Sequence, residues 1–360
     1  MSGNSWGRIF RLTTFGESHG PGIGGVLDGC PAGVPLDEAF VQQRLDRRKP
    51  GAALAGMAGT ARKESDTVHL LSGVFEGRTT GTPIAFLIKN EDQRSRDYGP
   101  LAHAYRPGHA DMTYDAKYGV RDYRGGGRAS ARETAARVAG GAVAEALLAR
   151  HGISVLAAAV ELGGIPAQRV DMDGALQRPY GAADDGVVPQ WEAALKEARG
   201  AGDTLGGIVQ IVARGVPAGL GEPVFGKLDA MLAAALMGVG AVKGVEIGAG
   251  FAAARLRGSQ NNDALMPDAQ GICFDGNNAG GILGGISSGQ EIVVRVAVKP
   301  IPSIAQAQQT VDNQGHPLSL TVGGRHDICA IPRILPVLSA MTLLTLADAL
   351  LLQRRMEPRP

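Results

Sequence analysis

The sequence has few cysteines and almost no net charge, and each shortage excludes a class of protein. The three cysteines, Cys30, Cys273 and Cys329, are far apart without a C-x-x-C spacing, so neither a disulfide framework nor a zinc site is predicted. Lysine plus arginine (36) nearly equals aspartate plus glutamate (35), which argues against a nucleic-acid or polyanion binder that works through bulk charge. Any anion site must therefore be local.

Targeting and membrane-spanning segments are also lacking. Residues Met1 to Arg11 contain no apolar stretch of signal-peptide length. The uncharged run Ile334 to Ala347 is interrupted by Pro336 and covers 14 residues, which is too short to span a bilayer. We therefore expect a buried helix there, in a soluble protein of the reducing cytoplasm with no membrane or nucleic-acid partner. The seven histidines show no H-E-x-x-H or similar spacing, so no metal site is predicted.

Glycine and arginine, by contrast, are abundant. The 53 glycines among 360 residues are about twice the usual share, whereas glycine plus proline stays below the level that indicates low-complexity disorder. Arginine outnumbers lysine by 28 to 8. Its planar fork matches phosphate and carboxylate groups, although a GC-rich genome or surface solubility would give the same bias.

Hydrophobic periodicity predicts a mixed α/β or α+β protein, because short β-branched runs alternate with longer Ala/Leu-rich runs. Strands are expected at Gly207–Val212 and Glu291–Val298. Ser130, with Glu133 three residues on, is typical of a capping box at the start of a helix that ends near Arg150. Residues 171–189 read as an exposed loop, and no linker separates two domains. Further helices are predicted over Leu36–Arg47, Trp191–Arg199, Val224–Met237 and Val337–Arg354.

A weak internal similarity relates Gly29–Pro35 to Gly215–Gly221. Each segment follows a predicted strand and precedes a predicted helix. The pair is consistent with a duplicated strand-turn-helix unit, although matches of this length also arise by chance in a chain rich in glycine and alanine.

The glycine-rich segment Arg124–Arg132 leads into the capped helix. Exposed backbone N–H groups, a helix N-terminus and arginines make it a candidate cradle for phosphate or another anion. A flexible turn with surface arginines is the alternative. The segment lacks the G-x-G-x-x-G spacing of dinucleotide sites and the Gly-Lys-Ser/Thr of a Walker loop.

Three further segments place histidine or aspartate beside glycine, namely Gly16–Gly20, Arg106–Asp111 and Gly323–Asp327. Charged residues beside apolar structure are either paired for stability or poised for catalysis, and each segment alone could be an ordinary turn. A Ser-His-Asp hydrolase using Ser18, His109 and Asp327 would lack the G-x-S-x-G elbow. The glycine-rich runs 238–244 and 279–289 suggest backbone closely apposed to a flat or bulky group, a tight strand crossing or a subunit contact.

Together these segments resemble chorismate synthase, and the similarity covers nearly the whole chain in the family's order. The segments that carry it are Thr14–Gly20 with Asp28–Gly29, Asp46–Gly51, Leu71–Gly77, Arg106–Asp111, Arg121–Thr134, Gly215–Gly221, Val242–Gly248, Gly280–Gly289 and Arg325–Asp327.

The resemblance implies a single α+β domain over residues 1–360, with a β-α-β sandwich, a possible internal duplication and a disordered tail at about 355–360. It also implies an anti-1,4-elimination that converts 5-enolpyruvylshikimate 3-phosphate to chorismate and phosphate. The family requires reduced FMN although the reaction is redox-neutral, because the flavin is thought to lend an electron and recover it. A homotetramer supplied with reduced flavin by an external reductant is expected.

Roles for individual residues follow from the same resemblance. His19 would protonate the departing phosphate, and His109 would supply a proton to reduced flavin or stabilise its charge. Asp327, with Ser18, would assist removal of a proton at flavin N5. The substrate-binding arginines would be Arg48, Arg106, Arg132 and Arg325. The FMN-binding residues would be Arg128, Ala129, Ser130, Gly240, Ala241, Gly284, Lys299, Pro300, Ile301, Pro302, Ser303 and Arg325.

The sequence departs from the family pattern at four positions. Leu54 stands where arginine is common, and Arg62 or Arg78 is a candidate replacement. Ile328 stands for proline, Ser339 for glutamate and Gly240 for asparagine. Two other classes remain as alternatives: a flavoprotein oxidoreductase, which would need its own NADPH site, and a non-catalytic phosphate-binding protein.

Overall fold

Two five-stranded antiparallel sheets organise the computed structural model, which describes residues 3–49, 53–59, 65–91, 101–268, 271–323 and 326–356. The first sheet has the order β1-β2-β3-β7-β4. Its strands are β1 (Ser5–Trp6), β2 (Arg11–Gly16), β3 (Gly22–Asp28), β4 (Val68–Leu70) and β7 (Ile84–Lys89).

The second sheet has the order β11-β16-β10-β8-β9. β10 pairs antiparallel with both β8 and β16, and β16 also pairs with β11. The strands are β8 (Ser154–Leu162), β9 (Ile165–Pro166), β10 (Gly207–Arg214), β11 (Val242–Ile247) and β16 (Ile292–Val298).

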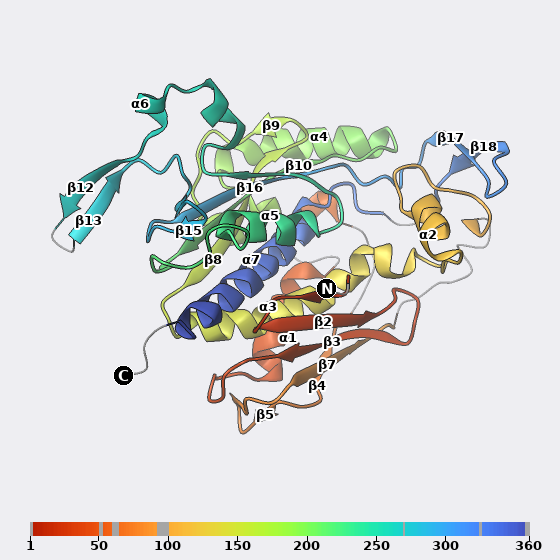
Figure 1. Ribbon diagram of the computed structural model, residues 1–360. Coiled ribbons are helices and arrows are strands. Elements are labelled where there is room, and N and C mark those ends of the chain that lie inside the picture. The colour runs from red at the N-terminus through yellow and green to blue at the C-terminus, as the bar shows by residue number, and fades with distance from the viewer. Residues whose placement is uncertain are drawn as a thin grey trace.

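Three helices lie between the sheets: α1 (Glu38–Arg48), α3 (Thr134–Ala149) and α7 (Ile331–Arg354) (Figure 1). α3 contacts β2 and β3 of the first sheet, whereas α7 contacts β8 and β10 of the second. Burial alternates along β7 and β16, as expected for strands with one face against a helical layer. One continuous cluster of buried apolar residues joins both sheets and these helices.

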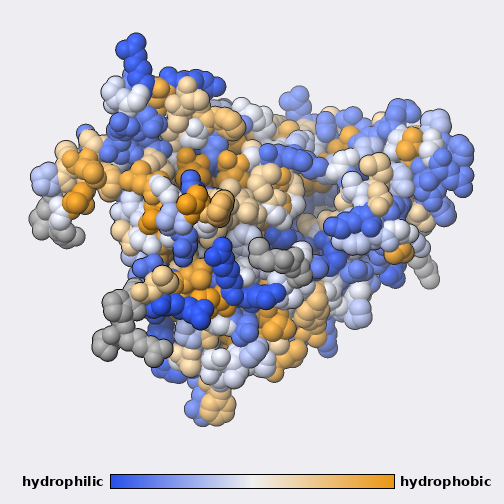
Figure 2. All heavy atoms as spheres, viewed as in Figure 1, coloured by the Kyte–Doolittle hydropathy of each residue, from blue (hydrophilic) through white to orange (hydrophobic). Residues whose placement is uncertain are grey.

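The remaining elements surround this core. The β12–β13 hairpin projects from the body on the left of Figure 1, and Figure 2 shows apolar side chains gathered on it, among them Leu265 and Ile272. The helices are α2 (Asp111–Tyr118), α4 (Val188–Gly200), α5 (Leu228–Met237) and α6 (Gly258–Asn261). The short strands are β5 (Val74–Phe75), β6 (Arg78–Thr79), β12 (Ala264–Asp268), β13 (Gly271–Asp275), β14 (Ile282–Leu283), β15 (Ile286–Ser287), β17 (Ala307–Val311) and β18 (Pro317–Thr321).

The mixed α+β class and both expected strands are confirmed, but two helix starts were wrong. α5 begins at Leu228 rather than Val224, since Pro223 and Gly226 disfavour helix in the preceding segment. α7 begins at Ile331, six residues before the predicted start. Pro332 occupies its first turn, where no backbone N–H is needed, and the helix continues through Pro336.

Two other expectations also change. Ser130 caps the 3-10 turn Ala131–Glu133 instead of α3, and the Glu133 carboxylate pairs with Arg137 rather than closing a capping box. The predicted loop 171–189 contains three short 3-10 helices, Ala175–Gln177, Pro179–Gly181 and Asp185–Val187, before α4 starts at Val188. Within the predicted tail, residues 357–360 lie outside the described part of the chain.

α7 is long and apolar enough to cross a membrane by length and composition, so the argument that this segment is too short was wrong. However, 89% of its most apolar window is buried inside the protein. That burial is typical of a core helix, as the sequence predicted.

The two segments related by the internal similarity make matching hydrogen bonds. The Thr79 hydroxyl donates to Pro31 O (2.6 Å) and accepts from Val34 N (3.0 Å). In the second half, the Ser287 hydroxyl donates to Pro217 O (2.6 Å) and accepts from Leu220 N (2.8 Å). In each half, one hydroxyl of a two-stranded hairpin thus bonds to both ends of the turn. The hairpin is β5–β6 in the first half and β14–β15 in the second.

Candidate active site

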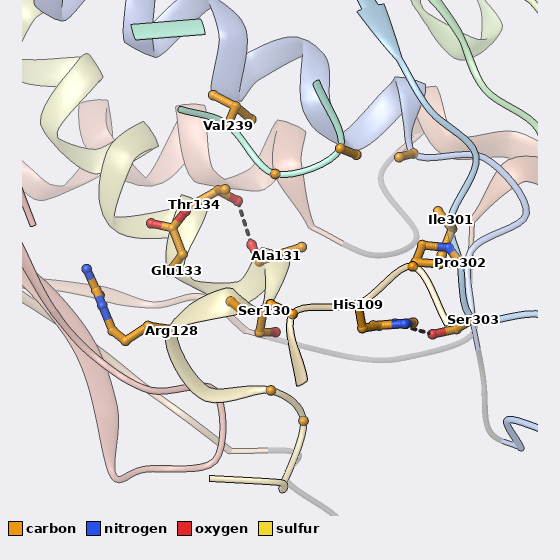
Figure 3. Close-up of a pocket in the computed structure, with 18 of the residues that line it drawn as sticks. His109, Arg128, Ser130, Ala131, Glu133, Thr134, Val239, Ile301, Pro302 and Ser303 are labelled. Atoms are coloured by element: carbon orange, nitrogen blue, oxygen red, sulfur yellow. Dashed lines mark hydrogen bonds between the residues drawn. The ribbon is translucent and has the colours of Figure 1, made fainter. Parts of the chain in front are cut away.

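A cavity of about 570 Å³ lies where the helical layer meets the second sheet, and its volume is within the range of small-molecule sites. Its walls come from five segments: the turn before α2, the glycine-rich loop with the start of α3, the α5–β11 loop, residues 299–303 and the start of α7. Figure 3 shows several of the lining side chains. Segments that are far apart in sequence therefore meet at one site.

The glycine-rich loop folds against the two other sequence motifs. Gly125 has a φ of 64°, and a Cβ there would lie 2.2 Å from Cε1 of His19. A Cβ at Gly126 would lie 3.4 Å from Nη2 of Arg106. The absence of side chains thus lets this loop approach both residues.

The arginines of this loop do not point together into the cavity. Arg128 donates to Thr14 Oγ1 (2.8 Å) and Gly16 O (3.2 Å) of β2, and in Figure 3 its side chain extends away from His109. Arg124 forms a bidentate salt bridge with Asp122, with both N···O distances at 2.8 Å. The loop therefore contributes mainly backbone and small side chains, including Ala129 and Ser130, to the cavity wall.

His109 lies in the cavity wall and is held by two hydrogen bonds. Its Nδ1 is 3.1 Å from Pro107 O and its Nε2 is 2.9 Å from Ser303 Oγ. Because a carbonyl only accepts, Nδ1 carries the proton and Nε2 accepts from the serine hydroxyl. Burial, assisted by the nearby Arg106 guanidinium, lowers the pKa of His109 to about 4. The imidazole is neutral at pH 7.

Ser18 and His19 are neighbours across the glycine-rich loop from the cavity. The Ser18 hydroxyl lies 3.2 Å from His19 Nδ1. Neither residue lines the cavity itself, although Gly125, which His19 contacts, does. His19 is therefore separated from the cavity by a single layer of glycine backbone.

Asp327 also lines the cavity and is 9% exposed. Its Oδ2 accepts a hydrogen bond from Nη1 of Arg333 at 2.7 Å. Arg333 stands on the first turn of α7, and its Nε also lies 3.4 Å from Arg48 O. Arg325 lies outside the described residues.

Two of the predicted substrate arginines share one buried carboxylate. Arg48 is 1% exposed and donates to Asp66 Oδ2 (2.9 Å), while Arg132 pairs with Asp66 Oδ1. Burial raises the pKa of Asp66, but the two guanidinium groups outweigh it, so the pKa lies below its usual range. Arg48 lines the cavity and Arg132 does not.

The third predicted arginine, Arg106, is also paired. Its Nε and Nη2 each donate to the Asp111 carboxylate at 2.8 Å. Arg121, which follows the C-terminus of α2, approaches the same carboxylate, and its Nη1 lies 3.7 Å from Oδ1. All three side chains line the cavity.

Most residues predicted to bind FMN also line the cavity. Ala241 has the unusual φ of 73° and accepts a hydrogen bond from Lys299 N at 2.9 Å, which joins the α5–β11 loop to residues 299–303. Gly284 and Pro300 are not among the lining residues, and Gly284 lies in the β14–β15 turn. The lining residues of this set are Arg128, Ala129, Ser130, Gly240, Ala241, Lys299, Ile301, Pro302 and Ser303.

The structure shows the surroundings of several positions at which the sequence departs from the family pattern. Ile328 N donates to Ala58 O at 2.8 Å, a bond that proline could not make. Ser339 borders a second cavity of about 70 Å³ beside the Arg44–Glu145 pair. Arg78 is on β6, away from the main cavity, and its Nη1 donates to Gly33 O. Arg62 lies outside the described residues, as does the side chain of Leu54.

Three residues that pair with the charged groups of the site were not singled out by sequence reasoning: Asp66, Arg121 and Arg333. Asp111 and Arg121 lie inside quoted motifs, but nothing local in the sequence shows which arginine pairs with which carboxylate. Asp66 and Arg333 become visible only when α1, α3 and α7 are packed together. Among the described residues, no group of three potential metal ligands is present.

This geometry defines a class. A cavity with several guanidinium groups, two histidines nearby and an aspartate in its wall is typical of an enzyme that acts on a small anionic substrate.

Comparison with known proteins specifies the family. The sequence model for "Chorismate synthase" matches residues 10–351. The chain is 70% identical to chorismate synthase of Nitratidesulfovibrio vulgaris (strain DSM 19637 / Miyazaki F), over 99% of this chain and all of that protein. It is 62% identical to the Maridesulfovibrio salexigens enzyme at the same coverage. A crystal structure of chorismate synthase matches with a TM-score of 0.78 and 34% identity, over 97% of this chain and 93% of that one.

The chain belongs to the chorismate synthase family. It is therefore a lyase of aromatic amino-acid biosynthesis that eliminates phosphate from 5-enolpyruvylshikimate 3-phosphate to give chorismate.

Proposed function

We propose that the anti-1,4-elimination takes place in the 570 Å³ cavity, with reduced FMN and substrate bound there together. The observation that carries this proposal is that Arg106, His109, Asp327 and the glycine-rich loop all line one cavity, although they are spread over more than 200 residues.

The fit of a flavin rests on the shape and chemistry of one side of the cavity. A Cβ built at Gly240 would have no described atom within 4 Å, so the α5–β11 loop presents open backbone there. Backbone and small side chains at 129–130, 240–241 and 301–303 would hold FMN, and Lys299 in the same part of the lining would supply a positive charge. When bound, reduced FMN supplies an electron to the substrate and recovers it, so that no net oxidation occurs.

The histidines have different tasks in this proposal. His19 protonates the departing phosphate, and Ser18, at 3.2 Å from Nδ1, orients its ring. His109 starts as a neutral imidazole because burial and Arg106 lower its pKa. An anion bound beside it would raise that pKa, so binding itself would allow the ring to take up and hold a proton.

Asp327, assisted by Ser18, acts in removal of a proton at flavin N5. Its pairing with Arg333 at 2.7 Å holds the carboxylate in the wall before any ligand arrives. Such preorganisation keeps the acceptor in place without reorganisation at the moment of transfer.

Arg48, Arg106, Arg132 and Arg325 bind the phosphate and carboxylates of the substrate. Charge-assisted bonds from guanidinium groups are the strongest available for such anions. Of the three described members, Arg48 and Arg106 line the cavity, and Arg106 lies beside Gly126 of the glycine-rich loop.

The test is anaerobic turnover of purified protein with reduced FMN and 5-enolpyruvylshikimate 3-phosphate. Chorismate and phosphate should form in equal amounts, and folded, flavin-binding protein that forms neither would refute the proposal. His19→Ala and Asp327→Ala should each lower kcat by orders of magnitude while FMN affinity stays close to normal. Wild-type turnover in either variant would refute the role assigned to that residue.

An external reductant is part of the proposal. NADPH alone should leave FMN oxidised in the purified protein, and direct reduction by NADPH would favour the oxidoreductase alternative. Titration of FMN with and without substrate separates the phosphate-binding alternative, since an enzyme that binds both in one cavity should show mutual tightening.

We also propose a single domain of the β-α-β sandwich type, built by duplication. β2, β3, β4 and β7 occupy the same places in the first sheet as β8, β10, β11 and β16 in the second. α1 and α5 follow corresponding strands, and the Thr79 and Ser287 hydrogen bonds match. The continuous core across both sheets supports one domain.

Assembly and location complete the proposal. A cytoplasmic homotetramer is supported by apolar side chains that stand exposed on the projecting hairpin, such as Leu265 (65%) and Ile272 (74%). Sedimentation equilibrium would test it, and a monomer at micromolar concentration would refute the tetramer.

A further inference from the structure

We propose that Arg121 is a positioning residue for Arg106, and that it takes over the Asp111 carboxylate when Arg106 turns to an anionic substrate. The proposal rests on the role proposed above for Arg106.

Arg121 is almost completely buried and anchors the chain segment that leads to Arg106. Its Nη2 is 3.1 Å from each of the carbonyl oxygens of Leu101, Ala102 and Ala104, and its Nε donates to Asp115 at 3.0 Å. Its guanidinium carbon lies 5.5 Å from the ring centroid of Tyr105. The backbone before Arg106 is therefore held by one side chain.

The third nitrogen of Arg121 is different. Within the described part of the chain, Nη1 is buried and has no hydrogen-bond acceptor. It lies 3.7 Å from Asp111 Oδ1, beyond hydrogen-bond length but close enough for ionic attraction. Buried donors without acceptors are rare in folded proteins, so this one requires an explanation.

The state of Asp111 supplies that explanation. Both of its oxygens are occupied by Arg106, through Nε, Nη2 and the backbone N at 3.0 Å. Burial raises the pKa of Asp111, but these bonds outweigh it, so the pKa lies below its usual range and the group is ionised. While Arg106 is held in this way, Oδ1 faces Arg106 and not Arg121.

Binding of the substrate changes this balance. If Arg106 turns to a phosphate or carboxylate, an ionised and buried Asp111 would lose its partner, which is costly. A movement of about 1 Å would bring Oδ1 within hydrogen-bond distance of Arg121 Nη1. Arg121 thus lowers the free-energy cost of releasing Arg106. Its Nη1, which has no acceptor before the substrate binds, would donate to Asp111 in the substrate complex.

A double-mutant cycle tests this coupling through the dissociation constant of 5-enolpyruvylshikimate 3-phosphate, measured calorimetrically with oxidised FMN present. Arg121→Lys keeps the charge but has one nitrogen in place of three, and Asp111→Asn removes the carboxylate. Arg121→Lys should weaken substrate binding about tenfold in the wild-type background, but it should have almost no effect when added to Asp111→Asn, because Arg106 then leaves no buried carboxylate behind. FMN affinity should change less than twofold.

Lys117→Gln is the matched control, since it removes a cation from α2 near Asp111 without contact to it, and it should bind substrate as the wild type does. An effect of Arg121→Lys that is the same, about tenfold, with and without the Asp111 carboxylate would overturn the proposal, because it would mean that Arg121 acts only by anchoring residues 101–104. Wild-type protein without turnover would instead refute the proposed function.

A structure of the wild-type protein with substrate and FMN provides a second test that does not depend on folding of a variant. Arg121 Nη1 should lie within about 3.2 Å of Asp111, with at least one Arg106–Asp111 bond broken. An unchanged Arg106–Asp111 pair in that complex would overturn the proposal.

Discussion

The hydroxyl of Ser303 donates a hydrogen bond to Nε2 of His109 across 2.9 Å, although 194 residues separate the two in sequence. The Pro107 carbonyl accepts a hydrogen bond from Nδ1–H, so both ring nitrogens of a neutral imidazole have partners. This contact joins the turn before α2 to the segment after β16 and keeps His109 uncharged in the wall of the cavity.

The pH dependence of stability should report this uncharged state. The unfolded chain protonates His109 near its usual pKa of about 6.5, whereas the folded protein does so only at a pKa of about 4. Protonation therefore favours the unfolded state. The contribution of His109 to the free energy of unfolding is complete above about pH 6.5 and is lost as the pH falls toward 4. When the pH is lowered from about 7.5 to about 5, the wild type should therefore lose about 2 kcal/mol more of its free energy of unfolding than His109→Asn does, because the variant has no imidazole to protonate.

Denaturant unfolding of both proteins at several pH values makes this comparison. His316→Asn is the control, because that histidine is exposed and pairs only with Asp312 at the surface. Parallel pH curves for wild type and His109→Asn would contradict the lowered pKa.

Asp348, in the middle of α7, is fully buried and accepts backbone N–H bonds from Arg8, Ile9 and Phe10 at 2.7–3.0 Å. Asp348→Asn replaces one accepting oxygen by an NH₂ group that faces donors. We expect a loss of about 3 kcal/mol in the free energy of unfolding. Glu197→Gln on the exposed face of α4 is the matched control, and equal stability of the two variants would show that the carboxylate does not hold the N-terminal segment.

Gly141 marks the closest approach of α3 to α7. A Cβ there would lie 2.3 Å from Cβ and 2.6 Å from Cα of Ala340, so Gly141→Ala must push the helices apart. We expect destabilisation of about 1–3 kcal/mol, which outweighs the gain in helix propensity of about 1 kcal/mol. Gly200→Ala, also in a helix but with nothing within 4 Å of the new Cβ, should be neutral or stabilising. The prediction fails if both variants melt at a lower Tm than the wild type, or if both melt at a higher Tm.

The proposed duplication predicts similar effects in the two halves. Thr79→Val and Ser287→Ala each remove a buried hydroxyl and leave a backbone N–H and C=O without their partner. Each should cost about 1–3 kcal/mol of unfolding free energy. Thr82→Val, an exposed position beside the same hairpin, should change stability by less than about 0.5 kcal/mol. A loss in one half alone would argue that the two turns are not equivalent.

Elements with strong periodicity were predicted well, and their boundaries were not. The alternation at 291–298 and the apolar run of α7 are local properties of the chain. The start of α7 at Ile331 was missed, because prolines were taken as helix stops although Pro332 falls where no N–H is required. The capping box was wrong because Arg137, one turn further on, provides Glu133 with a stronger partner.

The sequence by itself determined the family and the reaction, because the order of its motifs along the chain can be recognised without knowledge of the fold. Only the tertiary structure decided which residues of those motifs meet and in what state. It turned Arg128 toward β2, buried Arg48 against Asp66, and kept His109 neutral. These outcomes depend on desolvation and on contacts between residues far apart in the chain, and neither can be read from the neighbours of a residue in sequence.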